Sequence, residues 1–270
     1  MTTGHRAADG LDLADPGTMA RLALACLDLT SLGDADTEAD VAALARQAAG
    51  PHGRPAALCV WPRLVARARR EAPEGVAIAA VANFPHGGAD VETALRDAGQ
   101  IADAGGDEVD LVLPWRALRA GDSRTAASVV AAVRRDCPGL RLKVILESGA
   151  LPDAAAVRRA AALALAEGAD FLKTSTGRIA TGATPAAAQA MLEAIAAAPG
   201  SRAGFKASGG VRSLADVALY ADLVRRVLGP TALSPARLRF GASGLMAAIE
   251  TALGEPGRAA GATGDRPAGY

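Results

Sequence analysis

Six charged side chains interrupt apolar runs of the sequence, at places where a strand covered on both sides should carry none. They are three carboxylates and three lysines, namely Asp28, Asp110, Glu147, Lys143, Lys173 and Lys206. Burial of an isolated charge costs several kcal/mol, so such groups must pair with one another or lie at the rim of a sheet. Lys143 and Glu147 are four residues apart and are therefore expected to point to the same side of one strand. The pattern predicts one internal polar cluster, with a purely structural ion network as the alternative.

Two lysines on nearby strands have a specific chemical use. An amine attacks a carbonyl only when it is unprotonated, and a free lysine has a pKa of about 10.4. A neighbouring ammonium and partial burial both lower that pKa. Of Lys173 and Lys206, one could therefore act as a nucleophile while the other stays cationic. Asp28 and Asp110 would then orient a water or carry protons for a carbinolamine.

Glycine-containing turns follow the last three of the apolar runs, at residues 174–178, 208–212 and 241–244. Glycine lets backbone N–H groups approach an oxyanion, and each turn precedes a helix whose N-terminus is positively polarised. Arg178 and Arg212 lie in the first two turns. We therefore predict an anion site here for a phosphorylated carbonyl substrate, which Thr176 and Lys143 also contact. The alternative is that these are ordinary turns between strands and helices.

Eight short apolar runs, separated by alanine-rich stretches of helical periodicity, are predicted to be strands. They are residues 26–30, 57–61, 76–83, 108–113, 142–147, 171–176, 204–208 and 238–243. Asp90 and Ser213 are suited to cap helices at 91–104 and 214–228. A strand and a helix about every thirty residues predict an α/β fold, the (β/α)8 TIM barrel, for which about 250 residues are typical. A doubly wound open sheet shows the same alternation and is the alternative, although no Gly-x-Gly-x-x-Gly follows the first strand.

The 270 residues are interpreted as one barrel domain at about 22–253, with a short N-terminal extension and a flexible tail at 255–270. The 29 basic and 29 acidic residues cancel, which argues against nucleic acid or an anionic membrane as the main partner. Three cysteines, far apart in the chain, fit neither a disulfide framework nor a zinc site, and no metal site is expected. Because no signal peptide or membrane span is recognisable, we expect a cytoplasmic protein.

Segments from Leu22 to Leu253 together resemble the deoxyribose-phosphate aldolase family, and they occur in the order of that family. They are Leu-Asp-Leu-Thr at 27–30, Cys-Val-Trp-Pro-Arg at 59–63, Asn-Phe-Pro-His-Gly at 83–87, Asp-Glu-Val-Asp at 107–110, Leu-Lys-Val-Ile-Leu-Glu at 142–147, Phe-Leu-Lys-Thr-Ser-Thr-Gly at 171–177, Gly-Phe-Lys-Ala-Ser-Gly-Gly-Val-Arg at 204–212 and Arg-Phe-Gly-Ala-Ser at 239–243. The two lysine motifs at 171–177 and 204–212 are specific in combination, whereas either alone is only suggestive.

The resemblance implies a class I aldolase, free of cofactor and metal, that reversibly cleaves 2-deoxy-D-ribose 5-phosphate to glyceraldehyde 3-phosphate and acetaldehyde. It implies that Lys173 forms the Schiff base, that Lys206 lowers the pKa of Lys173, and that Asp110 handles protons with a bound water. Asp28 and Thr30 match residues that line the substrate pocket. The matches to the family's phosphate cradle are Gly177, Gly209, Gly210, Gly241 and Ser243.

Three positions qualify this resemblance. Arg178 stands where many relatives have lysine, and Gly244 stands where some have a second serine, which removes one hydroxyl from the cradle. Tyr270 ends the tail, and in some relatives a C-terminal tyrosine assists proton transfer at the acetaldehyde methyl. The resemblance implies that role for Tyr270, although a disordered end is the usual state of a terminus.

Two other functions stay open. One is a class I aldolase that acts on a different sugar phosphate, and the other is a catalytically inactive barrel that binds phosphosugars. The expected partners are small phosphorylated sugars and aldehydes, and a homo-oligomer such as a dimer is left open.

Overall fold

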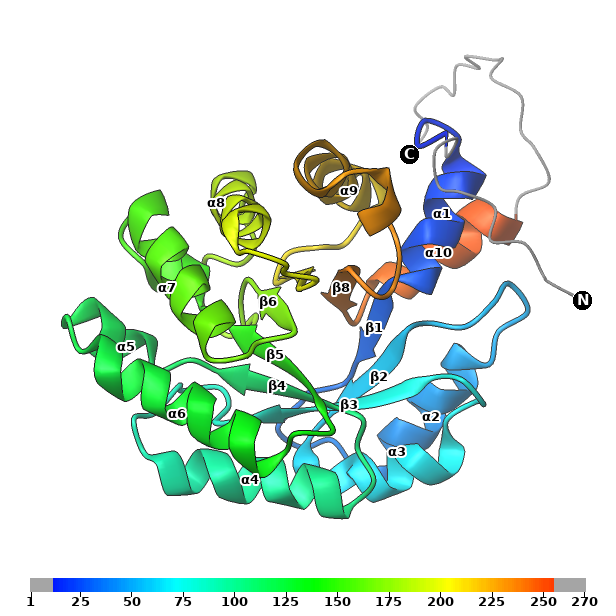
Figure 1. The fold of residues 1–270 in the computed structure, drawn as a ribbon. Coiled ribbons are helices and arrows are strands. Elements are labelled where there is room, and N and C mark those ends of the chain that lie inside the picture. The colour runs from blue at the N-terminus through cyan, green and yellow to red at the C-terminus, as the bar shows by residue number, and fades with distance from the viewer. Residues whose placement is uncertain (1–11, 255–270) are drawn as a thin grey trace, which may run out of the picture.

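Residues 12–254 form a closed barrel of eight parallel strands in the computed structural model, which describes this part of the chain. The strands are β1 (Leu27–Thr30), β2 (Ala57–Val60), β3 (Ala77–Ala82), β4 (Glu108–Val112), β5 (Arg141–Ile145), β6 (Phe171–Lys173), β7 (Gly204–Ser208) and β8 (Leu238–Ala242). Each strand pairs with its neighbour in sequence, and β8 pairs with β1. This closure confirms the predicted TIM barrel and excludes the doubly wound sheet (Figure 1).

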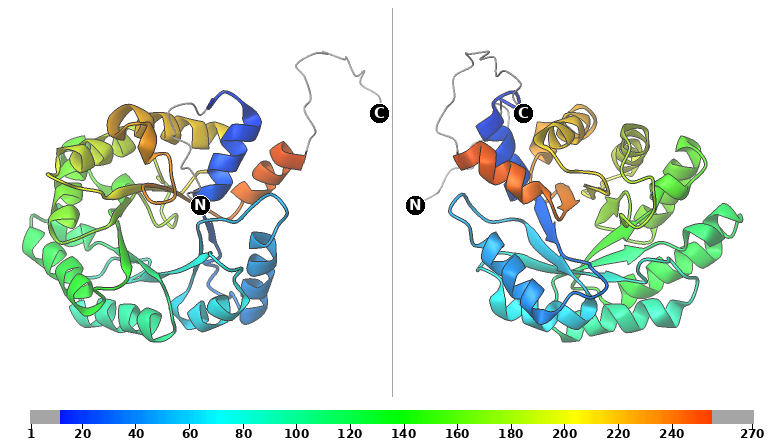
Figure 2. Two further views of the ribbon diagram at one scale, coloured as in Figure 1. Left: turned by 45° about the vertical axis from the view of Figure 1, so that its right-hand side comes forward. Right: turned by 180° about the vertical axis from the view of Figure 1, so that it is seen from behind.

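Helices cover the outer face of the barrel, as the two further views in Figure 2 show. They are α1 (Pro16–Ala25), α2 (Glu38–Ala48), α3 (Val65–Glu71), α4 (Val91–Asp103), α5 (Trp115–Arg119), α6 (Ser123–Asp136), α7 (Ala154–Ala166), α8 (Pro185–Ala197), α9 (Leu214–Leu228) and α10 (Leu245–Gly254). Short 3₁₀ turns are η2 (Pro62–Leu64), η3 (Ser148–Ala150) and η4 (Pro230–Ala232). None of the helices within residues 12–254 combines the length and the apolar character that a membrane crossing requires.

The helix starts follow the predicted capping residues. The side chain of Asp90 accepts a hydrogen bond from the backbone of Glu92 at the start of α4. Ser213 and Asp216 form a capping box at the start of α9. Such caps satisfy backbone N–H groups that the helix itself leaves free, which is why short polar residues mark these boundaries.

The N-terminal extension contains a helix that the strand–helix pattern did not predict. Asp15 caps α1 and Pro16 occupies its first turn, which suits proline because that position needs no N–H donor. The helix packs against α9 and α10, and Figure 1 shows it beside α10. It therefore completes the outer layer next to β8 and β1.

The register of the strands brings the charged residues together. Lys173, Lys206 and Arg239 are neighbours across β6, β7 and β8, and Asp110 lies beside Lys143 across β4 and β5. On the opposite wall, the small residues of β2 and β3 form a separate buried cluster, consisting of Ala57, Cys59, Ala79 and Val81. Short side chains on that wall leave space inside the barrel for the long cationic ones.

Candidate active site

The interior of the barrel holds a network of charged side chains that are almost completely buried. Its carboxylates are Asp28, Glu108 and Asp110, and its cations are Lys143, Lys173, Lys206 and Arg239. Each of these residues is at most 3% exposed. The three lysines are all the lysines that the sequence contains. Charges this deep must be paired, because water cannot solvate them.

Lys143 joins the three carboxylates at the centre of the network. Its Nζ lies 3.0 Å from Asp28 Oδ2, 2.6 Å from Glu108 Oε2 and 2.8 Å from Asp110 Oδ1. Burial lowers the pKa of Lys143, but the carboxylates outweigh burial and raise that pKa well above its usual value. Lys143 is therefore a permanent ammonium at neutral pH.

Asp110 links the central ammonium to the other two lysines. Its Oδ2 lies 2.8 Å from Lys173 Nζ and 2.7 Å from Lys206 Nζ. Burial raises the pKa of Asp110, but Lys143, Lys173 and Lys206 outweigh it and hold the pKa well below its usual value. Asp110 is therefore an ionised carboxylate that can accept a proton.

The pKa values of Lys173 and Lys206 are shifted in opposite directions although the two lysines lie side by side. Burial lowers the pKa of both, but for Lys206 the attraction of Asp110 and Asp28 wins and its pKa is raised. For Lys173 burial wins, with the repulsion of Lys206 added to it, over the single carboxylate of Asp110, so its pKa is lowered. The geometry thus makes Lys173 the more readily deprotonated amine of the pair.

A cavity of about 590 Å³ opens at the carboxyl ends of β1, β6, β7 and β8, and Lys173 lies in its wall. Thr30, Thr176, Arg178, Arg212 and Ser243 also line it, together with Gly177, Gly209, Gly210 and Gly241. Asp28 and Lys143, which we predicted to contact substrate, do not line the cavity. They lie in the network below it, where Asp28 contacts Lys206 and Arg239.

Glycine is required at two positions of the cavity wall. Gly209 has a φ of +81°, and a Cβ there would approach Gly182 Cα to 3.0 Å. A Cβ on Gly241 would lie 2.9 Å from the Cβ of Ser208 and 3.0 Å from Cε of Lys206. A side chain at either position would therefore strain the backbone or displace a neighbour.

Positive charge at the rim comes from side chains and from helix ends. Arg178 donates to the carbonyl of Leu32 and forms an ion pair of 2.9 Å with Asp34. Arg212 is exposed and directly precedes the cap of α9, and Ser243 lies just before α10. Two helix N-termini and two guanidinium groups at one cavity suit a phosphate.

A buried lysine of lowered pKa in the wall of a positively charged cavity is the arrangement expected of an aldolase that works through a Schiff base. A family model described as DeoC/LacD family aldolase matches residues 22–245. The chain belongs to this family. It is an enzyme, a carbon–carbon lyase of the class I aldolase type.

Relatives of this aldolase agree in sequence and in fold. A protein of Agrobacterium fabrum named deoxyribose-phosphate aldolase is 43% identical over 255 residues, covering 93% of this chain and 98% of that protein. The structure of a putative deoxyribose-phosphate aldolase from Toxoplasma gondii has a TM-score of 0.83 at 26% identity, over 90% of this chain and 99% of that one. A deoxyribose phosphate aldolase from Aeropyrum pernix, described as tetrameric, has a TM-score of 0.66 at 26% identity, over 88% and 92% of the two chains. The predicted family is thereby confirmed.

One predicted member of the internal cluster is wrong. Glu147 follows β5 in a left-handed backbone conformation, with a φ of 50°, so the alternation of the strand no longer directs its side chain. Its carboxylate accepts hydrogen bonds from the backbone N and from Oγ1 of Thr176, at 3.2 and 2.6 Å. Glu147 therefore supports the turn after β6 and does not contact the lysines of the network.

Two members of the network were missed by the sequence analysis. Glu108 opens β4 and Arg239 is the second residue of β8. Charges at the start of a strand are easily attributed to its exposed end, but both side chains are buried. The signal was present, because Glu108 and Asp110 are two residues apart and hence share one face of their strand.

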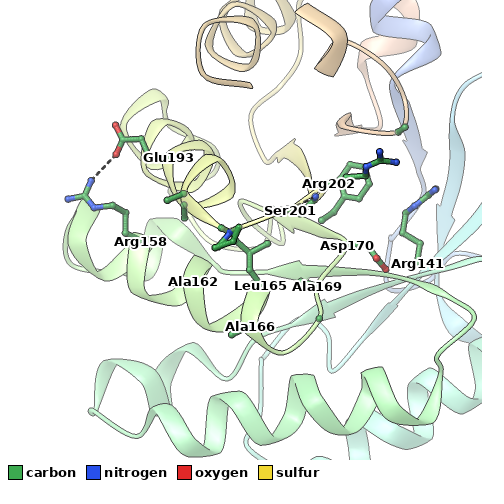
Figure 3. A pocket seen from close by; sticks show the side chains of 18 residues that line it. Arg141, Arg158, Ala162, Leu165, Ala166, Ala169, Asp170, Glu193, Ser201 and Arg202 are labelled. Carbon is green, nitrogen blue, oxygen red and sulfur yellow. Dashed lines mark hydrogen bonds and ion pairs between the residues drawn. The ribbon is translucent and has the colours of Figure 1, made fainter. Parts of the chain in front are cut away.

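A larger cavity, of about 1020 Å³, lies at the other end of the barrel between α7 and α8 (Figure 3). No lysine lines it, and Arg158 and Glu193 in its wall pair with each other at 3.2 Å. Among residues 12–254, no group of three or more His, Cys, Asp or Glu side chains could hold a metal ion. Tyr270 lies outside the described residues.

Proposed function

We propose that this aldolase reversibly cleaves 2-deoxy-D-ribose 5-phosphate into glyceraldehyde 3-phosphate and acetaldehyde through a Schiff base on Lys173. The observation that carries the proposal is that Lys173 alone among the three lysines lines the cavity, and its pKa is lowered. The name of the Agrobacterium fabrum relative supports this choice of substrate. The cavity, with its two arginines and helix N-termini, is suited to the 5-phosphate.

The reaction begins when neutral Lys173 attacks the C1 aldehyde of the open-chain sugar. The carbinolamine then loses water, with Asp110 and a water molecule transferring the protons. Asp110 lies 2.8 Å from Lys173 Nζ and exchanges protons with that water, while Lys206, 2.7 Å from Asp110, remains an ammonium throughout.

The iminium ion then accepts the electrons of the C2–C3 bond. The C3 hydroxyl gives up its proton, and C3 becomes the aldehyde carbon of glyceraldehyde 3-phosphate. The enamine that remains is protonated at C2, and water hydrolyses the new iminium to release acetaldehyde and restore the Lys173 amine. The fixed positive charge of Lys206 disfavours a proton on Lys173 at each return to the free amine.

Binding of the phosphate is assigned to the turns at the cavity. Gly177, Gly209 and Gly210 have positive φ values, and this conformation turns consecutive backbone N–H groups toward one side. Gly241 and Ser243 come from the end of β8, and Thr30 comes from the end of the neighbouring strand β1. Arg178 and Arg212 add charge at the rim.

Reductive trapping tests the proposal. Borohydride reduction with acetaldehyde or deoxyribose 5-phosphate, followed by peptide mass mapping, should place the adduct on Lys173. An adduct on Lys143 or Lys206 would contradict this assignment, and tight phosphate binding without any adduct would favour the inactive barrel. Because the chain has only three lysines, the adduct can be assigned without a background of surface lysines.

Tyr270 is assigned, on the family resemblance, to proton transfer at C2 of the enamine. Removal of Tyr270 alone should lower turnover and leave folding and the trapped adduct on Lys173 unchanged. Unchanged turnover would overturn this part of the proposal.

Assembly and location are part of the same proposal. We propose a homo-oligomer in the cytoplasm, where phosphorylated sugars are available. The tetramer named for the Aeropyrum pernix protein supports assembly in the family. Light scattering of the purified protein measures the number of subunits.

A further inference from the structure

The charges inside the barrel do not cancel. The network contains three carboxylates and four cations, so one positive charge is in excess when every group is ionised. Arg141 also contacts Glu108, at 2.5 Å, but its side chain is 40% exposed and water solvates its charge. Loss of a single proton would make the buried network neutral.

The contacts decide which group gives up that proton. Lys143 contacts three carboxylates, and Lys206 and Arg239 contact two each. Lys173 contacts Asp110 alone among the carboxylates of the described residues. A guanidinium cannot lose its proton in a protein. The excess charge is therefore relieved most easily at Lys173.

From this balance we infer that Arg239, held in place by Glu108, is a positioning residue that favours the unprotonated form of Lys173 from the far end of the barrel interior. Arg239 does not line the substrate cavity but the opposite mouth of the barrel. Its guanidinium contacts Asp28 at 2.6 Å and Glu108 at 2.9 Å. The inference rests on the proposed function, in which Lys173 is the nucleophile.

The groups that face the two residues come from several strands. Lys173 is faced by Asp110 of β4, Lys206 of β7 and Cys59 of β2. Arg239 is faced by Asp28 of β1, Glu108 of β4, Lys143 of β5 and Cys26 beside β1. Burial raises the pKa of both thiols, so they stay uncharged near neutral pH and do not alter the balance.

Two substitutions that each remove one charge change the balance in opposite directions. In Arg239→Gln the network is neutral with all three lysines protonated, so the pKa of Lys173 should rise by about one unit. The neutral fraction of Lys173 at a given pH would fall about tenfold for that unit. Glu108→Gln adds to the excess positive charge and should lower the pKa of Lys173. The double variant, with both substitutions, again has one positive charge in excess. Its Lys173 pKa should therefore return toward the wild-type value.

The experiment is reductive trapping with acetaldehyde and cyanoborohydride over a range of pH, with the rate of the Lys173 adduct followed by peptide mass spectrometry. The midpoint of the pH profile should move up by about one unit in Arg239→Gln and down in Glu108→Gln. Arg239→Lys keeps the charge and should keep the wild-type midpoint. Comparison with wild type at each pH removes the pH dependence of the reductant itself.

The outcomes separate the inference from the proposed function. Absence of a Lys173 adduct in the wild type would overturn the proposed function. A wild-type adduct with unmoved midpoints in folded Arg239→Gln or in Glu108→Gln would overturn the inference, because a structural role changes the yield of folded enzyme and not the midpoint. Should Arg239→Gln fail to fold, Glu108→Gln and the double variant still test the inference. An upward shift of the pH midpoint in Glu108→Gln would contradict it.

Discussion

The buried network and the cavity above it use charge in opposite ways. In the network every charged group is almost fully buried, and most of the cations contact two or three carboxylates. At the cavity the arginines lie at the rim, where Arg178 has one carboxylate partner, Asp34, whose side chain is 82% exposed. Water screens the rim charges much more strongly than it screens the charges of the buried network.

This difference separates two kinds of function within one barrel. Buried charges determine which groups are protonated, so changes there should alter turnover and folding. The rim charges are proposed to attract and orient the substrate, so changes there should alter KM, and the change should depend on salt. Single substitutions at Lys173, Lys143, Arg212 and Asp34 test this division.

The largest expected effect is at the nucleophile. Lys173→Met should reduce kcat at least about 10³-fold and abolish the trapped adduct. Because the folded pKa of Lys173 is below its unfolded value, Lys173 destabilises the folded protein at neutral pH, and this cost disappears as the pH rises toward about 10.4. The variant should therefore be at least as stable as wild type in urea at pH 7. A loss of stability comparable with that of Lys143→Met would contradict the division between the network and the rim.

Lys143→Met makes the same chemical change on the neighbouring strand, but its main effect should be on the stability of the protein. It removes the one cation that contacts all three buried carboxylates, Asp28, Glu108 and Asp110, which should lower the free energy of unfolding by about 3–5 kcal/mol. Urea unfolding at pH 7 measures this loss, with Lys173→Met as the matched control. Equal stability of the two variants would show that Lys143 is not the centre of the network.

The fold was more predictable than the site, for reasons that particular residues illustrate. Apolar runs and capping residues such as Ser213 act locally, so eight strands and most of their helices could be recognised. Membership of the network depends on register and on where a strand ends. Glu147 lies two residues past Ile145, the last residue of β5, and is therefore not part of the network. Arg239 joined it because it lies beside Lys206 across two strands.

The cavity was predictable where backbone geometry determines it. Three glycine turns at strand ends indicated an anion site, and all three lie in its wall. Side chains were harder to place, because Asp28 and Lys143 are directed into the network by ion pairs that involve three other strands, β4, β7 and β8. Such long-range pairing leaves no local signal in the sequence.

A moderate effect is expected at the rim. Arg212→Gln should raise KM for deoxyribose 5-phosphate about tenfold, the size of one charge-assisted hydrogen bond, with kcat and stability close to wild type. Cleavage of unphosphorylated deoxyribose should not change. Arg135→Gln, an exposed arginine on α6, is the control and should leave KM unaltered. An unchanged KM in Arg212→Gln would remove this side chain from the phosphate site.

The smallest expected effect tests whether Asp34 competes with the substrate phosphate for Arg178. Asp34 holds the guanidinium of Arg178 at 2.9 Å, and exposed pairs of this kind contribute about 0–1 kcal/mol. Asp34→Asn should free Arg178 for the phosphate and lower KM about two- to threefold, and the difference from wild type should shrink at high salt. Steady-state kinetics at two salt concentrations measure this. An increase in KM would mean instead that Asp34 orients Arg178 toward the substrate, and the rim would then share the cooperative pairing of the buried network.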